Sequence, residues 1–152
     1  GPLAKITPED LPRRPNIHYP GQQPYSRLPH FLKGFDVCLM PFAINDATRY
    51  ISPTKTLEYM AAHKPIVSTP IHDVAATWAD VVAVADTPEA FGAAVERALG
   101  ETPAERAARR PREQAHLRQY GWDHIAGQMH NLLTAAWNAR HPVAAGQPVY
   151  ER

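Results

Sequence analysis

The sequence lacks the features that mark several classes of protein. It has one cysteine, Cys38, so no intrachain disulfide can form. Its 16 basic and 15 acidic residues leave a formal net charge of +1, too small to draw the whole chain toward nucleic acid or a membrane. No apolar run approaches the roughly 18 residues that span a bilayer, and the start GPLAKITPED has no signal-peptide pattern. We therefore expect a reducing, cytoplasmic location.

Residue patterns for several kinds of catalytic site are also missing. The eight histidines show no His-x-x-x-His spacing, so we expect no metal site and no cofactor. Cys38 lies inside the apolar run Val37–Met40, which predicts an inert thiol in the core rather than a nucleophile. There is no Gly-x-Ser-x-Gly elbow and no Walker loop.

What the sequence has is an alternation of short apolar runs with longer stretches of helical period. This pattern is typical of βα units around a parallel sheet, and 152 residues suit a single domain. A complete doubly wound domain has about six strands, so we expect residues 1–140 to form a partial domain truncated at its N-terminal side. The predicted strands are Asn16–Tyr19, Asp36–Met40, Pro65–Thr69 and Val81–Val84.

Helices are predicted between and after these strands. The first covers Tyr25–Lys33 and ends at Gly34, and the second begins with Ser52 as N-cap and Pro53 as its first residue. A third starts at Thr87-Pro88 and runs to Leu99, and Thr102 with Glu105 forms a capping box for a fourth. The charged stretch 105–118 is interpreted as a solvated helix face. A final amphipathic helix carries Trp122, Ile125, Met129, Leu132, Leu133 and Trp137, and residues 141–152 are expected to be disordered.

Three loops are candidates for ligand binding, because ligands of open α/β sheets bind beyond the carboxyl ends of the strands. The second of these loops leads into a helix whose first turn carries Lys55, where a positive charge is unfavourable next to the helix dipole. An anion bound to the free N–H groups of Thr54 and Lys55 would reverse that cost, and phosphate is the obvious anion. The candidate loops are Pro20–Tyr25, Pro41–Thr54 and Pro70–Asp73.

Glu58 follows Lys55 by three residues on the same helix face. One interpretation is an exposed ion pair worth about 0.2–0.5 kcal/mol. The other is that the Glu58 carboxylate accepts hydrogen bonds from the ribose hydroxyls of a nucleotide whose phosphates lie at the start of the helix. The spacing alone leaves both interpretations open.

The segment ISPTKTLEYMAAHKPIVST, Ile51–Thr69, resembles the donor-site segment of retaining GT-B glycosyltransferases of the family-four type. These usually read SPxKxxEYxAxGKPVVS, and the likeness reaches from about Asn16 to Leu99. It implies a Rossmann-like half of a GT-B fold that binds a nucleoside-diphosphate sugar. In that resemblance the diphosphate is held by Ser52, Thr54 and Lys55, with Lys55 stabilising the leaving group; Glu58 binds the ribose, and Gln23 and Tyr25 flank the base.

The chain departs from the family pattern at two positions. Tyr50 stands where relatives often carry a glutamate eight residues before the ribose-binding one, with Asn45 and Asp46 as nearby polar residues, and His63 replaces a glycine. The family's first βα unit and its N-terminal acceptor domain would precede Gly1. We therefore expect this chain alone to be inactive and the parent protein to act in polysaccharide or glycoconjugate assembly, with peripheral membrane association possible.

Two alternatives stay open at this point. The first is a non-catalytic nucleotide-binding or interaction module with a Rossmann-like fold, favoured by Tyr50. The second is a structural α/β domain in which Lys55 and Glu58 form an ordinary ion pair.

Overall fold

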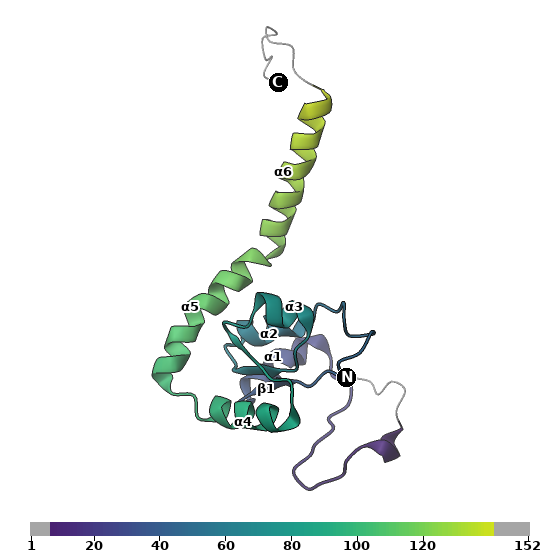
Figure 1. Cartoon of the computed structure of the whole chain (residues 1–152), viewed down its shortest axis with the longest axis vertical. Coiled ribbons are helices and arrows are strands. Elements are labelled where there is room, and N and C mark those ends of the chain that lie inside the picture. Colours follow the sequence, from purple (N-terminus) through teal and green to yellow (C-terminus); the bar gives the residue numbers. More distant parts are fainter. Residues whose placement is uncertain (1–6, 142–152) are drawn as a thin grey trace.

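Three short parallel strands form the centre of the fold (Figure 1). The computed structural model describes residues 7–141, so most of the predicted tail 141–152 lies outside the described residues. The strands β1 (Cys38–Met40), β2 (Ile66–Ser68) and β3 (Val82–Val84) pair in that order. Cys38 lies opposite Ile66, and Ile66 lies opposite Val82. The α/β class and these three predicted strands are confirmed, with shorter bounds.

The prediction of a strand at Asn16–Tyr19 is wrong. These residues form a turn and an extended loop with exposed side chains. The Tyr19 hydroxyl donates to the Pro12 carbonyl at 2.9 Å, and the Ile17 N–H donates to the Arg14 carbonyl at 3.0 Å. Prolines at 15 and 20 bracket the segment and lack the N–H that a ladder needs. As a result, no strand of the described chain pairs with the outer edge of β1.

The helices follow the predicted order with local differences. Tyr25–Lys33 divides into the 3-10 helix η2 (Tyr25–Arg27) and α1 (Leu28–Lys33). The predicted start at Thr87 is confirmed by its hydroxyl, which accepts from the Ala90 N–H at 3.2 Å. The capping box of Thr102 is confirmed as well. The remaining elements are η1 (Pro8–Asp10), α2 (Lys55–Ala61), α3 (His72–Thr77), α4 (Pro88–Leu99), α5 (Pro103–Gln119) and α6 (Trp122–Arg140).

Helix α2 begins two residues later than predicted, and α3 was not predicted at all. Thr54, rather than Ser52, is the N-cap of α2, and it makes no side-chain cap hydrogen bond. The turn before Lys55 is tight, because the Thr56 N–H donates to the Pro53 carbonyl three residues earlier. The six residues of α3 are too few to show a helical period in the sequence.

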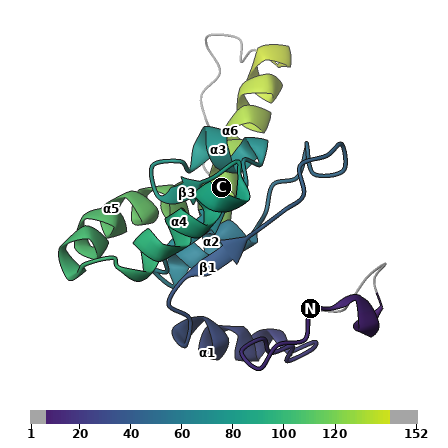
Figure 2. The same cartoon turned by 60° about the horizontal axis from the view of Figure 1, so that its bottom comes forward.

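The core lies on the side of the sheet that faces α2 and α3. Side chains alternate between the faces of a strand, so Cys38 and Ile66 join Met60 of α2 and Val74 of α3 in one cluster of buried residues. Helix α4 packs on β2 and β3 from the opposite side, as Figures 1 and 2 show. The main contacts of α4 are with β2 and β3, and Leu39 of β1 is 45% exposed.

Helix α5 was predicted to have a solvated, charged face, but two of its charged residues are buried. Glu113 is 0% exposed and Arg109 is 7% exposed. One carboxylate oxygen of Glu113 accepts a hydrogen bond from the Arg109 guanidinium, and the other lies 2.8 Å from His63 Nδ1. Arg109 also reaches Glu101 through Nε at 2.7 Å. This ion-pair network joins α5 to the C-terminal end of α2.

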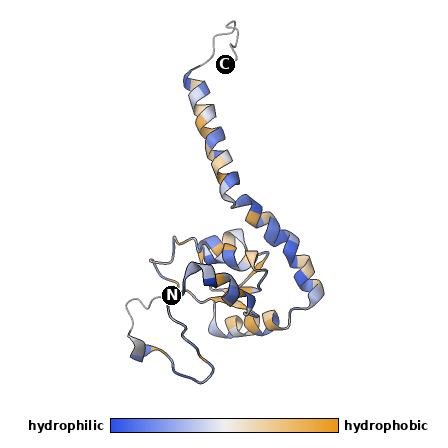
Figure 3. Cartoon of the chain, turned by 180° about the vertical axis from the view of Figure 1, so that it is seen from behind, coloured by the Kyte–Doolittle hydropathy of each residue, from blue (hydrophilic) through white to orange (hydrophobic). Residues whose placement is uncertain are grey.

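Helix α6 extends away from the sheet (Figure 1). The predicted helix is confirmed, but none of its residues is buried. Figure 3 shows apolar and polar residues alternating along it. In the described part of the chain, no helix combines the length and the apolar character needed to cross a membrane.

Candidate functional site

The position of α2 is set by two buried side chains that pack toward β1. Thr56 and Met60 are both 0% exposed, and the Thr56 hydroxyl lies 3.6 Å from the Met40 sulfur. These contacts fix the helix at the end of the loop that leaves the carboxyl end of β1. On the same helix Lys55 is exposed and Glu58 is half-buried, so both side chains are available to a ligand.

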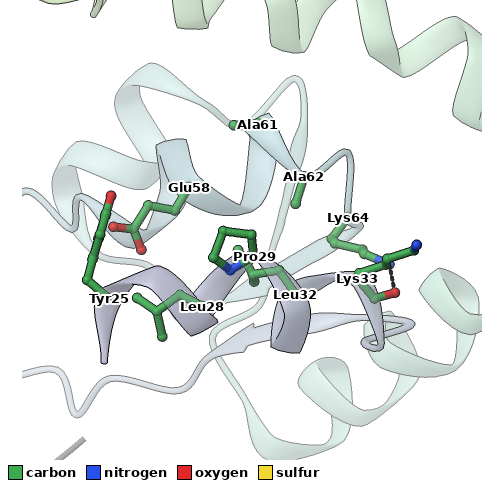
Figure 4. A pocket seen from close by; sticks show the side chains of 9 residues that line it. All are labelled: Tyr25, Leu28, Pro29, Leu32, Lys33, Glu58, Ala61, Ala62 and Lys64. Carbon is green, nitrogen blue, oxygen red and sulfur yellow. Dashed lines mark hydrogen bonds between the residues drawn. The ribbon is translucent and has the colours of Figure 1, made fainter. Parts of the chain in front are cut away.

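A pocket of about 470 Å³ lies between α1 and α2 (Figure 4). We call it the α1–α2 pocket. Its walls are mainly apolar, with Tyr25 and Glu58 at one end and Lys33 and Lys64 at the other. The volume is within the range of about 300–1,000 Å³ usual for small-molecule sites. Its lining residues are Tyr25, Leu28, Pro29, Leu32, Lys33, Glu58, Ala61, Ala62 and Lys64.

Lys64 fixes the far end of the α1–α2 pocket. Its ammonium group donates to the carbonyl of Lys33 at 3.1 Å and to that of Phe35 at 2.6 Å. Lys33 is the last residue of α1, where a helix has unsatisfied acceptors and negative partial charge, and Phe35 lies two residues beyond it. These hydrogen bonds hold the end of α1 beside the end of α2. The distance between the two helices at this end of the pocket is therefore fixed before any ligand binds.

The two residues predicted to flank a base have different roles in the structure. Tyr25 is 77% exposed and lines the pocket at the same end as Glu58. Gln23 does not line the pocket. Its amide nitrogen donates to the Pro20 carbonyl at 2.6 Å, and its amide oxygen accepts from Arg27 at 3.3 Å. Gln23 therefore shapes the loop that carries Tyr25.

Lys55 lines a separate, smaller cavity of about 150 Å³ at the carboxyl end of β1, together with Leu39, Met40, Pro41 and Phe42. Within the described residues, no ion pair joins Lys55 to Glu58. The ion pair required by the structural alternative is thus not formed. Ser52 and Thr54 are exposed next to Lys55, where the loop enters α2.

A third cavity, of about 320 Å³, lies where the loop after β1 meets the start of α3. Two of the three predicted ligand loops therefore meet, while Pro20–Tyr25 reaches the α1–α2 pocket instead. Asn45 orders this loop, because its side-chain oxygen accepts from the N–H groups of Ala47 at 3.0 Å and Thr48 at 3.2 Å. Polar lining residues include Asp46, Arg49 and His72.

These polar lining residues were only partly indicated by the sequence. Asp46 was named only as a neighbour of the missing glutamate, and His72 falls within a predicted ligand loop. Arg49 likewise falls within a predicted ligand loop, Pro41–Thr54, but neither Arg49 nor His72 was singled out as a site residue. Tyr50 is not among the residues that line this cavity. Its side chain is exposed, and the Arg49 guanidinium lies 5.4 Å from its ring centroid.

The titratable groups near β1 are perturbed by burial. Burial raises the pKa of the Cys38 thiol to about 11, and it also raises the pKa of the Tyr59 hydroxyl. A thiol with such a pKa is almost entirely protonated at neutral pH, so Cys38 is a poor nucleophile. Among residues 7–141, no three His, Cys, Asp or Glu side chains gather in a way that could hold a metal ion.

Comparison with known proteins adds a family match. The profile of the family described as glycosyl transferases group 1 matches residues 3–101. The chain is also 29% identical over 96 residues to a Bacillus subtilis (strain 168) protein named "Putative teichuronic acid biosynthesis glycosyltransferase TuaH". That match covers 61% of this chain and 24% of the relative, so the chain spans about a quarter of the relative's length. No solved structure matches the chain.

Proposed function

Because the chain belongs to the glycosyl transferases group 1 family, we propose that it binds the nucleoside-diphosphate sugar from which a glycosyl group is transferred. The observation that carries the proposal is the position of Glu58 and Tyr25 at one end of the α1–α2 pocket, one helical turn beyond Lys55. Tyr25 was predicted to flank the base and Glu58 to bind the ribose. Although these residues are far apart in the sequence, both line the same pocket.

The nucleoside occupies the Tyr25 end of this pocket. The exposed Tyr25 ring offers a flat surface against which a base can stack, and base stacking on an aromatic side chain contributes about 1–3 kcal/mol. The Glu58 carboxylate accepts hydrogen bonds from the two ribose hydroxyls. Apolar side chains of α1 and α2 exclude water from the rest of the pocket, which strengthens these hydrogen bonds.

The diphosphate lies at the start of α2, next to Ser52, Thr54 and Lys55. Ser52, Thr54 and Lys55 are exposed there, and Lys55 is on the same helix as Glu58. Negative charge develops on the diphosphate as the glycosyl bond breaks, and a fixed positive charge beside it lowers the energy of that state. Lys55 thus acts on the leaving group, and the reaction needs no further cofactor. Retention of anomeric configuration follows from the family resemblance alone.

The acceptor is bound by a part of the parent protein outside this chain. The relative is about four times as long as the matched segment, which gives room for an N-terminal acceptor domain. The relative's name refers to teichuronic acid biosynthesis. For the parent of this chain we propose a role in polysaccharide or glycoconjugate assembly in the cytoplasm, with peripheral membrane association. Alone, this chain binds the donor without transferring it.

A second candidate is a non-catalytic nucleotide-binding module. Tyr50 favours it, because this exposed side chain stands where relatives often have a carboxylate. The two candidates differ in chemistry rather than in binding. A parent protein that releases nucleoside diphosphate from a donor sugar supports the transferase, and one that only binds the donor supports the module.

The binding test is calorimetric titration of the chain with UDP, GDP and dTDP, extended by ligand-observed NMR for weak complexes. We expect one nucleotide to bind, and we expect Glu58→Gln and Lys55→Met each to weaken binding about tenfold to hundredfold. That range corresponds to about 1.5–3 kcal/mol for a hydrogen bond to a charged group. Glu89→Gln, at an exposed position in the first turn of α4, is the matched control. If neither substitution at α2 changes the affinity, the donor site lies elsewhere.

A further inference from the structure

The buried side chain of Arg109 in α5 uses all of its N–H groups. Its Nε and Nη2 donate to the two carboxylate oxygens of Glu101 at 2.7 and 2.9 Å, and its Nη1 donates to Glu113. The two remaining N–H groups donate to backbone carbonyls, from Nη1 to Lys64 at 3.3 Å and from Nη2 to His63 at 3.4 Å. A guanidinium group has five donors in a fixed fork, and here each of them has an acceptor.

These contacts hold the α2–β2 connection, residues 62–65, against α5. Arg109 binds two successive carbonyls of the connection, and the buried carboxylate of Glu113 lies 2.8 Å from His63 Nδ1. A glycine at position 63, as in the family pattern, would have no side chain to make the second contact. Arg109 and Glu113 both lie beyond residues 3–101, the part of the chain that the family profile matches.

Lys64 links the α2–β2 connection to α1. Its backbone N–H donates to the Tyr59 carbonyl of α2 at 3.1 Å. Its ammonium group donates to the carbonyls of Lys33 and Phe35, at one end of the α1–α2 pocket (Figure 4). Lys64 is therefore fixed at both ends, because α2 and α5 hold its backbone and the end of α1 holds its ammonium group.

We propose that Arg109 is a positioning residue for the α1–α2 pocket. It fixes the α2–β2 connection and, through Lys64, sets the distance between α1 and α2. Tyr25 belongs to η2, which runs directly into α1, whereas Glu58 belongs to α2. The same distance therefore sets the separation of the two residues that bind the nucleoside, so the assignment rests on the proposed donor site.

The shape of the arginine side chain matters here as well as its charge. A lysine at position 109 would keep the positive charge, but its three donors are on one nitrogen and cannot reach two carboxylates and two carbonyls together. Arg106 is the matched control on the same helix. Its Nε also donates to Glu101, at 3.2 Å, but within residues 7–141 no hydrogen bond joins its side chain to the α2–β2 connection.

The first test is amide hydrogen exchange of the chain without ligand. The Phe35 N–H is bonded at the end of α1, and the Phe91 N–H is bonded in the first turn of α4. We expect Arg109→Lys to accelerate exchange at Phe35 at least about fivefold and at Phe91 less than about twofold, because α1 opens locally. Arg106→Lys should change either rate less than about twofold. A general loss of stability would instead accelerate both amides.

Lys64→Met tests the route from α5 to α1. It should accelerate exchange at Phe35 as Arg109→Lys does, and adding Arg109→Lys to it should change the rate less than about twofold, because residues that act through one contact are not additive. Glu101→Gln leaves Arg109 in place with a weaker partner and should cause a smaller acceleration. It replaces Arg109→Lys if circular dichroism shows that this variant is unfolded. Unchanged exchange at Phe35, or additive effects in the double variant, would overturn the proposal.

The second test is calorimetric titration of the same variants with UDP, GDP and dTDP. We expect Arg109→Lys to weaken binding of the preferred nucleotide about threefold to tenfold, as residues coupled to a site without touching its ligand do. Arg106→Lys should leave the affinity unchanged. If the wild type binds none of these nucleotides, the donor site is wrong, and the exchange rates still decide whether Arg109 fixes α1. If Arg109→Lys binds the nucleotide as tightly as the wild type, Arg109 does not position the pocket.

Discussion

At the scale of single residues, His63 shows how one substitution in a family pattern is supported by another residue. Its φ of 53° is left-handed, a conformation in which a residue other than glycine loses about 1–2 kcal/mol. His63 remains favourable because its ring reaches the buried Glu113 carboxylate. A glycine would remove the strain and the contact together.

This arrangement predicts an order of stability among variants. His63→Ala should destabilise the fold by about 1.5–3 kcal/mol, since it keeps the strain and loses a hydrogen bond to a charged group. His63→Gly should cost about 1 kcal/mol less than His63→Ala, because glycine adopts positive φ without strain. Urea denaturation of the three proteins measures the differences. Equal losses in both variants would show that the backbone at this position is not strained.

Cys38 gives a prediction about reactivity. Burial raises the pKa of its thiol to about 11, and the side chain is 2% exposed. In the folded protein at pH 8 we expect almost no reaction with a thiol-specific disulfide reagent, and rapid reaction of one thiol in urea. Fast labelling without denaturant would mean that β1 opens to solvent.

At the scale of elements, the correct predictions were those that depend on residues close together in the sequence. Helix α4 and helix α5 begin with a threonine cap and a proline, signals that lie within a few residues, and both starts were correct. The strand prediction for Asn16–Tyr19 was based on a short run with apolar residues at alternate positions. It was wrong because a strand also needs a neighbouring strand to pair with, which these four residues cannot indicate. The burial of Glu113 could not be inferred, because it depends on where α5 docks.

In the candidate site, too, the sequence indicated individual residues but not how they are arranged. The sequence indicated Glu58 and Tyr25 through a family resemblance, but only the packing of α1 against α2 brings them to one pocket. It also suggested that Lys55 and Glu58 share a ligand or an ion pair. In the structure Glu58 lines the α1–α2 pocket and Lys55 lines the smaller cavity at the carboxyl end of β1, so a ligand shared by both residues has to extend from one cavity to the other.

The docking of α5 should depend on pH through Glu101. Hydrogen bonds from the Arg109 side chain are the main cause that lowers the pKa of Glu101 below its ordinary value of 4.5. A carboxyl group with a lowered folded-state pKa stabilises the fold above the unfolded pKa, and this stabilisation is lost as pH falls through the folded pKa. The free energy of unfolding should therefore decrease below about pH 4.5.

Glu101→Gln is the variant that isolates this effect. It should be less stable than the wild type at pH 7, and the difference between the two proteins should shrink as the pH is lowered toward 3. Urea denaturation at several pH values measures it. Parallel curves for the two proteins would show that the Arg109 pair contributes nothing to the docking of α5.

At the scale of the whole molecule, the chain consists of a packed α/β body and a helix that adds little to it. No residue of α6 is buried, while Tyr120, just before it, packs edge-on against the buried Trp78 with ring centroids 5.6 Å apart. Ending the chain after Gly121 removes no buried side chain of α6, so we expect it to change the melting temperature of the body by less than about 3 °C, as exposed positions contribute little to stability. Calorimetry at low protein concentration measures this, and a loss of cooperative melting would contradict it.

The unpaired edge of β1 has a consequence for the exchange of backbone protons with solvent. The Cys38 N–H points toward β2 and donates to the Pro65 carbonyl at 2.9 Å, so the N–H of the next residue, Leu39, points to the open edge. In deuterated water the Leu39 amide should exchange far sooner than that of Val67, which lies in the central strand. Of the three strands, only β2 is therefore paired on both sides, and the outward-facing N–H groups of an edge strand such as β1 exchange directly with the solvent.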